Sequence, residues 1–324
     1  MNRMKKLLVI EIVLILIMVT LNSLFSLSDG NERNIHSQSQ IEAEGTNISA
    51  AKPSHLTAEC AILVDMASGE VLFDKNADRK CYPASTTKIL TALLALENAA
   101  MDECFVVGEE VNLINPESSI AGIRYGEKLT LEQLLHGLLI SSGNDAAYTI
   151  AARTAGKMPG GEGLSDRDAV RFFTGKMNQR ANELGAKNSS FANPDGFHHD
   201  QHYSTAHDMA LIALEAMKHP EFKEIVRTEN FRLPDVTAID GYGEERSEQR
   251  FLINTNRLLL KGTNYHPYAT GVKTGHTDKA GYCLVSSAEK DGRTVLAVVM
   301  KSTEEKVWMD SRMLLDYGLS LHKD

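Results

Sequence analysis

Apolar residues fall into strand-like runs near both ends of the folded part of the chain. Cys60–Met66 is an apolar run, residues 67–70 form a turn, and Val71–Asp74 runs back, which predicts an N-terminal hairpin. Asp291 and Gly292 form a two-residue hairpin signal near the other end. The extended segments predicted around that signal are 269–277, 281–288 and 294–300. Together these segments predict an antiparallel sheet.

Between these runs, apolar residues recur at the three- and four-residue spacing of helices. Thr130 and Gln133 form a capping-box pair before one helix, and Gly185 is a candidate C-cap of another. The predicted helices are 85–98, 130–140, 145–155, 168–184, 206–218 and 307–319. The expected fold class is therefore α+β: an antiparallel sheet flanked by helices plus an all-helical subdomain from about residue 90 to 220. We expect the active cleft between the two.

The N-terminus has the pattern of an export signal. Basic residues Arg3, Lys5 and Lys6 precede an apolar stretch over 7–27. This pattern fits a cleaved signal peptide as well as an uncleaved membrane anchor, so residues 1–28 are assigned to either. Residues 29–57 have the polar composition of a flexible linker, and 58–324 are expected to form one catalytic domain. We expect the protein to act outside the cytoplasm.

Overall composition is that of a globular protein, because 43% of the 324 residues are hydrophobic and 24% are charged. The formal net charge of −9 argues against nucleic acid as a partner, since binding to phosphates needs a basic surface.

The cysteines and histidines are candidate metal or disulfide sites. The four cysteines lack metal-knuckle spacing, and Cys60 and Cys81 flank the predicted hairpin, so a disulfide between them and free buried thiols both stay open. The histidine-rich segment holds His198, His199, His202 and His207 with Asp200. Its spacing favours a structural loop over a metal site. We expect no metal and no organic cofactor.

Three short motifs occur in order: Ser85-Thr-Thr-Lys88, Ser142-Gly-Asn144 and Lys273-Thr-Gly275. Each is weak alone, and Ser-x-x-Lys also occurs at 49–52, 287–290 and 320–323. Alone, each motif also fits a helix cap, a turn or a strand end. Their order, on a predicted helix start, an interhelical turn and a strand, indicates a serine acyl-transfer site.

The chemistry assigns a role to each motif residue. Ser85 is the expected nucleophile and Lys88 the base. A serine hydroxyl reacts only when a base removes its proton, and a lysine amine can do so only in its neutral form. Ser142 is expected to relay a proton and Asn144 to hold Lys88 or the substrate. The expected substrate-binding residues are Lys273, Thr274, Gly275 and Thr277, suited to a carboxylate. The backbone N–H groups of Ser85 and His276 are the candidate oxyanion hole.

Longer segments around these motifs resemble a known family, the low-molecular-mass penicillin-binding proteins that act as serine D-Ala-D-Ala carboxypeptidases (peptidase family S11). The resemblance covers about 58–317 and is carried by 83–88, 191–196, 202–206, 254–258 and 273–282. It implies a β-lactamase/transpeptidase-like fold, acylation of Ser85, and peptidoglycan stem peptides as substrate. It also implies that β-lactams acylate Ser85 as mimics of D-Ala-D-Ala.

Three alternatives stay open from sequence. A D,D-endopeptidase would use the same site. A serine β-lactamase is disfavoured, because the related class A pattern has Asp where this chain has Gly143, and no Glu-x-x-Leu-Asn stretch lies between Asn144 and Lys273. A non-catalytic penicillin- or peptidoglycan-binding envelope module is the third.

Overall fold

The structure is a computed structural model that describes residues 52–239 and 245–321. The expected signal or anchor segment, 1–28, and most of the expected linker lie outside the described residues. Within the two described ranges, none of the helices combines the length and the apolar composition needed to cross a bilayer.

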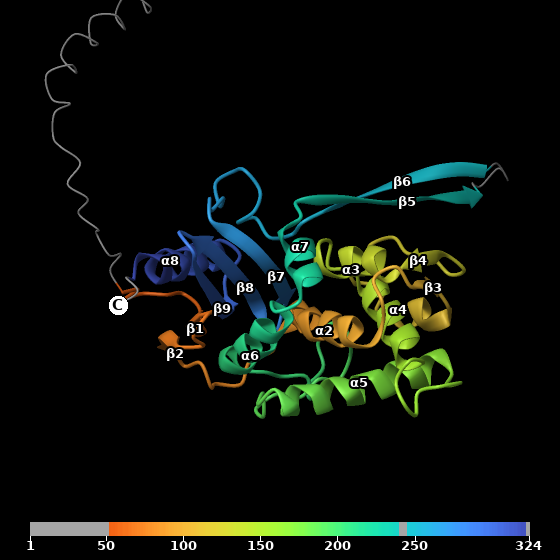
Figure 1. Ribbon diagram of the computed structural model, residues 1–324, viewed down its shortest axis with the longest axis horizontal. Helices are drawn as coiled ribbons and strands as arrows, with labels where there is room; N and C mark the ends of the chain where they lie inside the picture. The colour runs from red at the N-terminus through yellow and green to blue at the C-terminus, as the bar shows by residue number, and fades with distance from the viewer. Residues whose placement is uncertain (1–51, 240–244, 322–324) are drawn as a thin grey trace, which may run out of the picture. The chain divides into compact units, whose positions relative to one another are not determined.

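A five-stranded antiparallel sheet forms the centre of the fold, in the order β2-β1-β9-β8-β7 (Figure 1). The strands are β1 (Cys60–Asp65), β2 (Val71–Lys75), β7 (Ala269–Thr277), β8 (Gly281–Lys290) and β9 (Arg293–Ser302). Ile62 in β1 pairs with Val298 in β9, so the two ends of the domain join directly. The predicted N-terminal hairpin and the three predicted C-terminal strands are confirmed.

Both faces of the sheet are covered, which explains its continuous apolar runs. Ile62 and Val64 pack in the core shared with the helical part, whereas Ala61 and Leu63 pack in a second core that includes the buried face of α8 (Lys306–Ser320). Alternate strand residues point to opposite faces, so each side of β1 needs apolar side chains.

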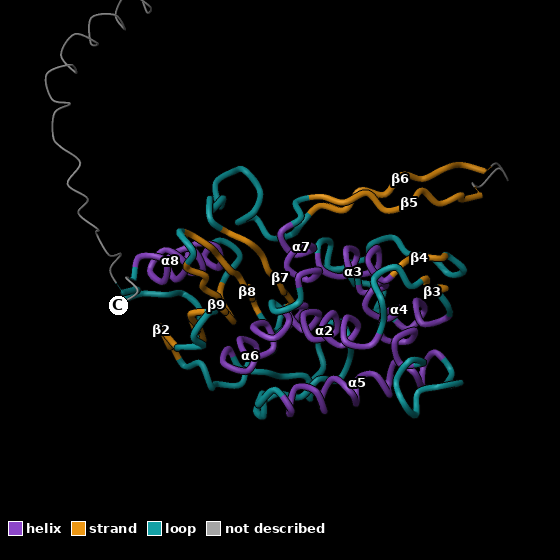
Figure 2. The backbone as a smooth tube through the Cα atoms, in the orientation of Figure 1, coloured by secondary structure: helices purple, strands orange, loops and turns teal. Residues whose placement is uncertain are grey.

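The helices between β2 and β7 surround α2, as the tube view shows (Figure 2). They are α2 (Lys88–Asn98), α3 (Leu131–Leu139), α4 (Asn144–Ala155), α5 (Asp166–Glu183), α6 (Ala206–Ala216) and α7 (Pro220–Arg227). Thr130 and Gln133 form the predicted capping box at the start of α3. Helix α5 begins two residues earlier than predicted, because Ser165 caps it by accepting a hydrogen bond from the N–H of Asp168. The α+β class is confirmed.

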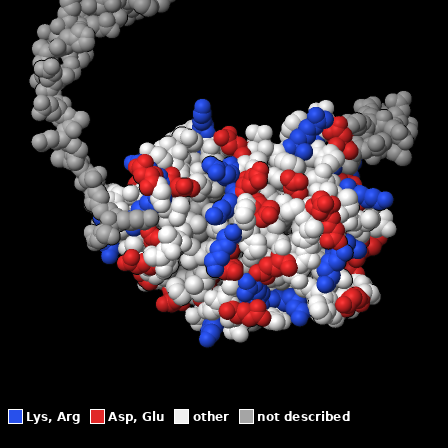
Figure 3. All heavy atoms as spheres, viewed as in Figure 1, with Lys and Arg blue, Asp and Glu red and all other residues white. Residues whose placement is uncertain are grey.

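The helical part is not all-helical, which corrects the prediction. It contains a short ladder of β3 (Cys104–Val106) and β4 (Lys128–Thr130), and a longer hairpin of β5 (Asn230–Ile239) and β6 (Glu245–Ile253) follows α7. The side chain of Arg250 holds this hairpin to the 122–127 loop by donating to the carbonyl of Gly122 at 2.9 Å. Acidic and basic side chains are interspersed over the face seen in Figure 3.

A buried carboxylate joins the beginning of the described chain to α8. Asp310 accepts hydrogen bonds from the N–H groups of Thr57 and Ala58, at 3.0 and 2.9 Å, and from the hydroxyl of Ser302 at 2.9 Å. Its side chain is fully buried, so these three donors replace the water that a carboxylate otherwise binds.

Candidate active site

Ser85 lies in a tight backbone turn held between two glycines. We predicted that Ser85 would lie in the first turn of an α-helix. It lies instead in a 3₁₀ helix, Ala84–Thr87, directly before α2. A Cβ atom on Gly196 would lie 1.9 Å from the carbonyl oxygen of Ala84, and one on Gly275 would lie 3.0 Å from the nitrogen of Ser85. Neither position has room for a side chain, so backbone packing fixes the serine.

Lys88 is the first residue of α2, and its side chain is fully buried. Its Nζ donates to Ser85 Oγ at 2.9 Å, to Asn144 Oδ1 at 2.7 Å and to the carbonyl of Asp195 at 2.7 Å. Burial lowers the pKa of Lys88 to about 8, against the opposing effect of Asp195 and Asp145. The amine is therefore neutral in roughly a tenth of the molecules at pH 7, far more than for an ordinary lysine.

The second motif forms the turn between α3 and α4. Ser142 is buried, has a left-handed φ of 63°, and lines the same cavity as Ser85. Asn144 opens α4, and its amide nitrogen donates to Ser118 Oγ at 2.8 Å. A Cβ on Gly143 would lie 2.6 Å from Asp145 Oδ1 and 2.9 Å from the nitrogen of Ala121. The turn thus has no space for the aspartate of the class A pattern.

The third motif lies on β7, the edge strand, beside the turn that holds Ser85. The hydroxyls of Thr274 and Thr255 are hydrogen-bonded at 2.6 Å, and the hydroxyl of Thr277 accepts from the N–H of Ala280 at 3.1 Å. The imidazole of His276 packs on Tyr282, with ring centroids 4.1 Å apart.

Lys273 differs from what we expected. Its side chain is 1% exposed, and its Nζ donates to the carbonyl of Thr274 at 3.1 Å. Burial, with the nearby Lys88 charge, holds the pKa of Lys273 well below its usual range. Burial is also the main cause of the lowered pKa of Lys88. Direct binding of a substrate carboxylate by Lys273 stays a prediction.

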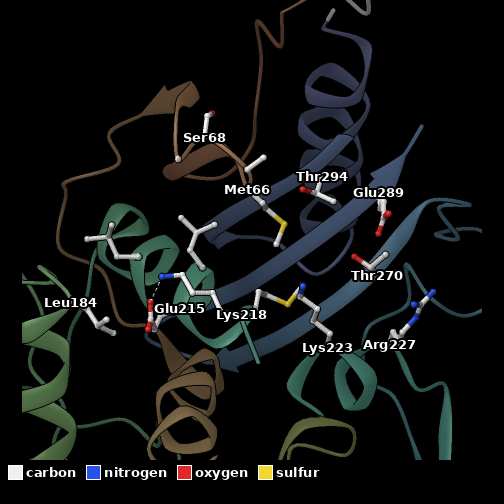
Figure 4. A pocket seen from close by; sticks show the side chains of 15 residues that line it. Met66, Ser68, Leu184, Glu215, Lys218, Lys223, Arg227, Thr270, Glu289 and Thr294 are labelled. Atoms are coloured by element: carbon white, nitrogen blue, oxygen red, sulfur yellow. Dashed lines mark hydrogen bonds and ion pairs between the residues drawn. The ribbon is translucent and has the colours of Figure 1, made fainter. Parts of the chain in front are cut away.

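Two cavities meet at Ser85 and His276. One, of about 260 Å³, is also lined by Ser142, Thr274 and Arg257. The other, of about 430 Å³, extends past Thr277 and Asn144 and is also lined by Glu117, Phe197, His198 and Asp278. A larger cavity of about 520 Å³ lies near the opposite end of β7 and includes Thr270 and Arg227 (Figure 4). It contains none of the predicted site residues.

Two functional candidates escaped the sequence reasoning. Asp195 is buried, accepts from the amide of Asn144 and from the N–H of Phe197, and lies beside Lys88; burial raises the pKa of its carboxyl. Arg257 is exposed, and its guanidinium lies 5.7 Å from the Trp308 ring centroid. Both lie in segments quoted for the family resemblance, 191–196 and 254–258, but no local signal marked either residue.

The histidine segment contributes a structural contact, and two of the cysteines lie next to each other. His202 is buried and hydrogen-bonded to Thr87 Oγ1 at 2.8 Å, and burial lowers its pKa to about 3. Among residues 52–239 and 245–321, no three His, Cys, Asp or Glu side chains gather as metal ligands would. The sulfurs of Cys60 and Cys81 are free thiols 3.1 Å apart.

Comparison with known proteins agrees with this geometry. Residues 46–304 match the peptidase S11 family, described as D-alanyl-D-alanine carboxypeptidase. The chain is 34% identical to D-alanyl-D-alanine carboxypeptidase DacF of Bacillus subtilis, over 82% of this chain and 63% of that protein. It is 35% identical to a D-alanyl-D-alanine carboxypeptidase of Streptomyces sp. K15, over 78% and 84% of the respective lengths.

Solved structures give the same result. The crystal structure of the Streptomyces K15 DD-transpeptidase has a TM-score of 0.73 and 32% identity to this chain, and the match covers 84% of this chain and 100% of that one. The chain therefore spans the whole of that solved structure but less than two thirds of the Bacillus relative.

Proposed function

The chain belongs to the peptidase S11 family of D-alanyl-D-alanine carboxypeptidases, and we propose that it removes the terminal D-alanine from D-Ala-D-Ala stem peptides of peptidoglycan. The resemblance deduced from the motifs is thereby confirmed for family and fold. The observation that carries the proposal is the buried Lys88 amine, hydrogen-bonded to the hydroxyl of Ser85 at 2.9 Å.

Acylation begins when neutral Lys88 accepts the proton of Ser85. The serine oxygen then attacks the carbonyl carbon of the bond between the two D-alanines, and the N–H groups of Ser85 and His276 bind the oxyanion. Ser142 takes that proton from Lys88 while it gives its own to the leaving nitrogen, so free D-alanine departs and Lys88 is neutral again. The hydrogen bonds from Lys88 to Asn144 and to the carbonyl of Asp195 support this role, because they fix the amine on Ser85.

The leaving D-alanine carries a carboxylate, and we assign its binding to Arg257 and Thr274 in the 260 Å³ cavity. A guanidinium binds carboxylates well and stays charged at all relevant pH values. Lys273, the expected anchor, lines neither cavity at Ser85. Its amine donates to the carbonyl of Thr274 and lies near enough to Lys88 for the Lys88 charge to lower the pKa of Lys273.

Water completes the cycle by hydrolysing the acyl ester, with Lys88 again accepting a proton and Ser85 released. β-Lactams enter the same path as mimics of D-Ala-D-Ala. A fast β-lactamase reaction is disfavoured, because no Glu-x-x-Leu-Asn stretch lies between Asn144 and Lys273 and the Gly143 turn has no room for the aspartate of the class A pattern. We therefore expect a long-lived penicilloyl adduct on Ser85.

The substrate places the protein outside the cytoplasm, which agrees with the export signal expected in residues 1–28. Whether that segment is cleaved or anchors the protein in the membrane stays a prediction. The same site would serve a D,D-endopeptidase, but a cation beside Thr274 favours substrates that end in a free carboxylate.

The test is release of D-alanine from a diacyl-Lys-D-Ala-D-Ala peptide by the full chain. Ser85→Ala should abolish both release and labelling by fluorescent penicillin. Ser320→Ala, which changes the serine of another Ser-x-x-Lys match, should retain both and serves as the matched control. If folded parent protein released no D-alanine but labelled with penicillin, and cut a cross-linked dimer, the endopeptidase reading would replace ours. If the folded protein neither released D-alanine, nor labelled with penicillin, nor cut the cross-linked dimer, a non-catalytic binding module would be the better hypothesis.

A further inference from the structure

Cys60 and Cys81 approach each other although twenty residues separate them. Cys60 opens β1 and is fully buried, and Cys81 is 7% exposed. The backbone of Cys81 exchanges two hydrogen bonds with Ser204, at 2.8 and 2.9 Å. Both thiols are thus fixed by backbone pairing, with their sulfurs 3.1 Å apart. A bond between them needs a movement of only about 1 Å.

A basic cavity is lined in part by one of these cysteines, Cys81. It measures about 260 Å³, includes Cys81 in its wall, and is lined by four cations and a single carboxylate: Arg79, Lys80, Lys279, Lys301 and Asp200. Glu59, outside the cavity, pairs with Arg79 and Lys301 at 2.9 and 3.0 Å. Even after these pairs, Lys80 and Lys279 leave the cavity positive, which favours entry of an anion.

We propose that Cys60 and Cys81 are a redox-active dithiol that closes to a disulfide, and that the basic cavity beside Cys81 admits the negatively charged disulfide that oxidises it. The first thiolate attacks the entering disulfide, forms a mixed disulfide and expels one thiolate. The second cysteine then attacks the protein sulfur of that mixed disulfide and expels the other. Two protein thiols lose two electrons and two protons, and the entering disulfide is reduced to two thiols.

The other cysteines are worse partners. The hydrogen bond between the two thiols lowers the pKa of Cys60 and, with burial, raises that of Cys81, so the first proton lost belongs to the pair rather than to one residue. Exchange of the remaining proton across the 3.1 Å contact lets Cys81, which lines the cavity, react as the thiolate. Burial raises the pKa of Cys283 to about 12, so it forms little thiolate. Cys104 is exposed on β3 and is not within the contacts of this pair.

The test is oxidation of the reduced full chain by oxidised glutathione, which is anionic, or by cystamine, a cationic disulfide. Alkylation and peptide mass analysis then identify the linked cysteines. We expect a Cys60–Cys81 cross-link, with Cys104 and Cys283 alkylated after denaturation, and a melting temperature about 5 °C above that of the reduced protein. Cross-linking through Cys283, or a free Cys60 and Cys81 after prolonged exposure, would overturn the proposal.

Two variants test its parts separately. Cys60→Ser should trap glutathione on Cys81, because the resolving thiol is gone, whereas Cys283→Ser should still form the cross-link. Lys80→Gln with Lys301→Gln should slow oxidation by glutathione disulfide about fivefold and leave the cystamine rate equal or higher; Lys176→Gln, on α5, is the matched control. Equal slowing of oxidation by both reagents would refute the role of the basic cavity. Whether Cys60 and Cys81 form a disulfide is tested by the wild-type cross-link alone, without any variant.

Discussion

Acylation of Ser85 should accelerate as pH rises through the pKa of Lys88. Only the neutral amine can accept the serine proton, and burial lowers that pKa to about 8. The neutral fraction is then roughly 10% at pH 7 and roughly 90% at pH 9, so the acylation rate should rise about ninefold over this range and level off above it. An ordinary lysine would remain almost wholly protonated at both values.

The assay is the rate of labelling by fluorescent penicillin at low reagent concentration, from about pH 6 to about pH 10, with circular dichroism at each pH to show that the fold persists. Asp195→Asn provides a second, signed test. The Asp195 charge raises the pKa of Lys88, so removing it should move the midpoint of the profile to lower pH. A rate that is flat between pH 7 and 9, or an Asp195→Asn midpoint at higher pH, would refute the assignment of Lys88 as the base.

Three further predictions follow from contacts described above. Arg257→Gln should raise KM for release of D-alanine at least tenfold with little change in kcat. The control is a peptide that ends in an amide, whose turnover the substitution should not change. Equal losses on the two peptides would contradict binding of the substrate carboxylate by Arg257. Gly196→Ala should abolish penicillin labelling, because the new Cβ would lie 1.9 Å from the Ala84 carbonyl oxygen; labelling at the parent rate would show that the turn tolerates movement. Asp310→Ala leaves three donors without their acceptor, two of them buried, and should lower the free energy of unfolding by about 3 kcal/mol in urea titration, while labelling of the folded protein at low temperature persists.

Local signals in the sequence were sufficient for much of the fold. The Thr130–Gln133 capping box and the apolar runs of β1 and β9 each lie where the pattern placed them, because their physics acts within a few residues or along one strand. The β5–β6 hairpin was missed since Glu245–Ile253 mixes charged and apolar residues without clean alternation. Helix α7 was missed because it has only eight residues.

The site was predictable in its motifs and less so in its electrostatics. Ser85, Lys88 and Asn144 do meet, through contacts that span 56 residues of chain. The contact of Lys88 with Asp195 spans 107 residues, so no spacing rule could have found it. The burial of Lys273 was equally hidden, because a lysine in a strand is ordinarily expected to reach solvent. The three-dimensional structure is needed to show that the amines of Lys88 and Lys273 are buried and that the guanidinium of Arg257 is exposed.

The close packing of Gly196 and Gly275 against the turn that holds Ser85 separates the position of the nucleophile from the residues that select the substrate. Main-chain packing positions the turn that carries the nucleophile, so the exposed side chains around the two cavities are free to change without displacing it. Glu117, His198, Asp278 and Arg257 could be exchanged to suit a different acyl donor, or to admit an amine in place of water, while the reacting oxygen stays where it is. Selectivity could then change independently of reactivity, because reactivity depends on the packed turn and on buried Lys88, whereas selectivity depends on exposed side chains.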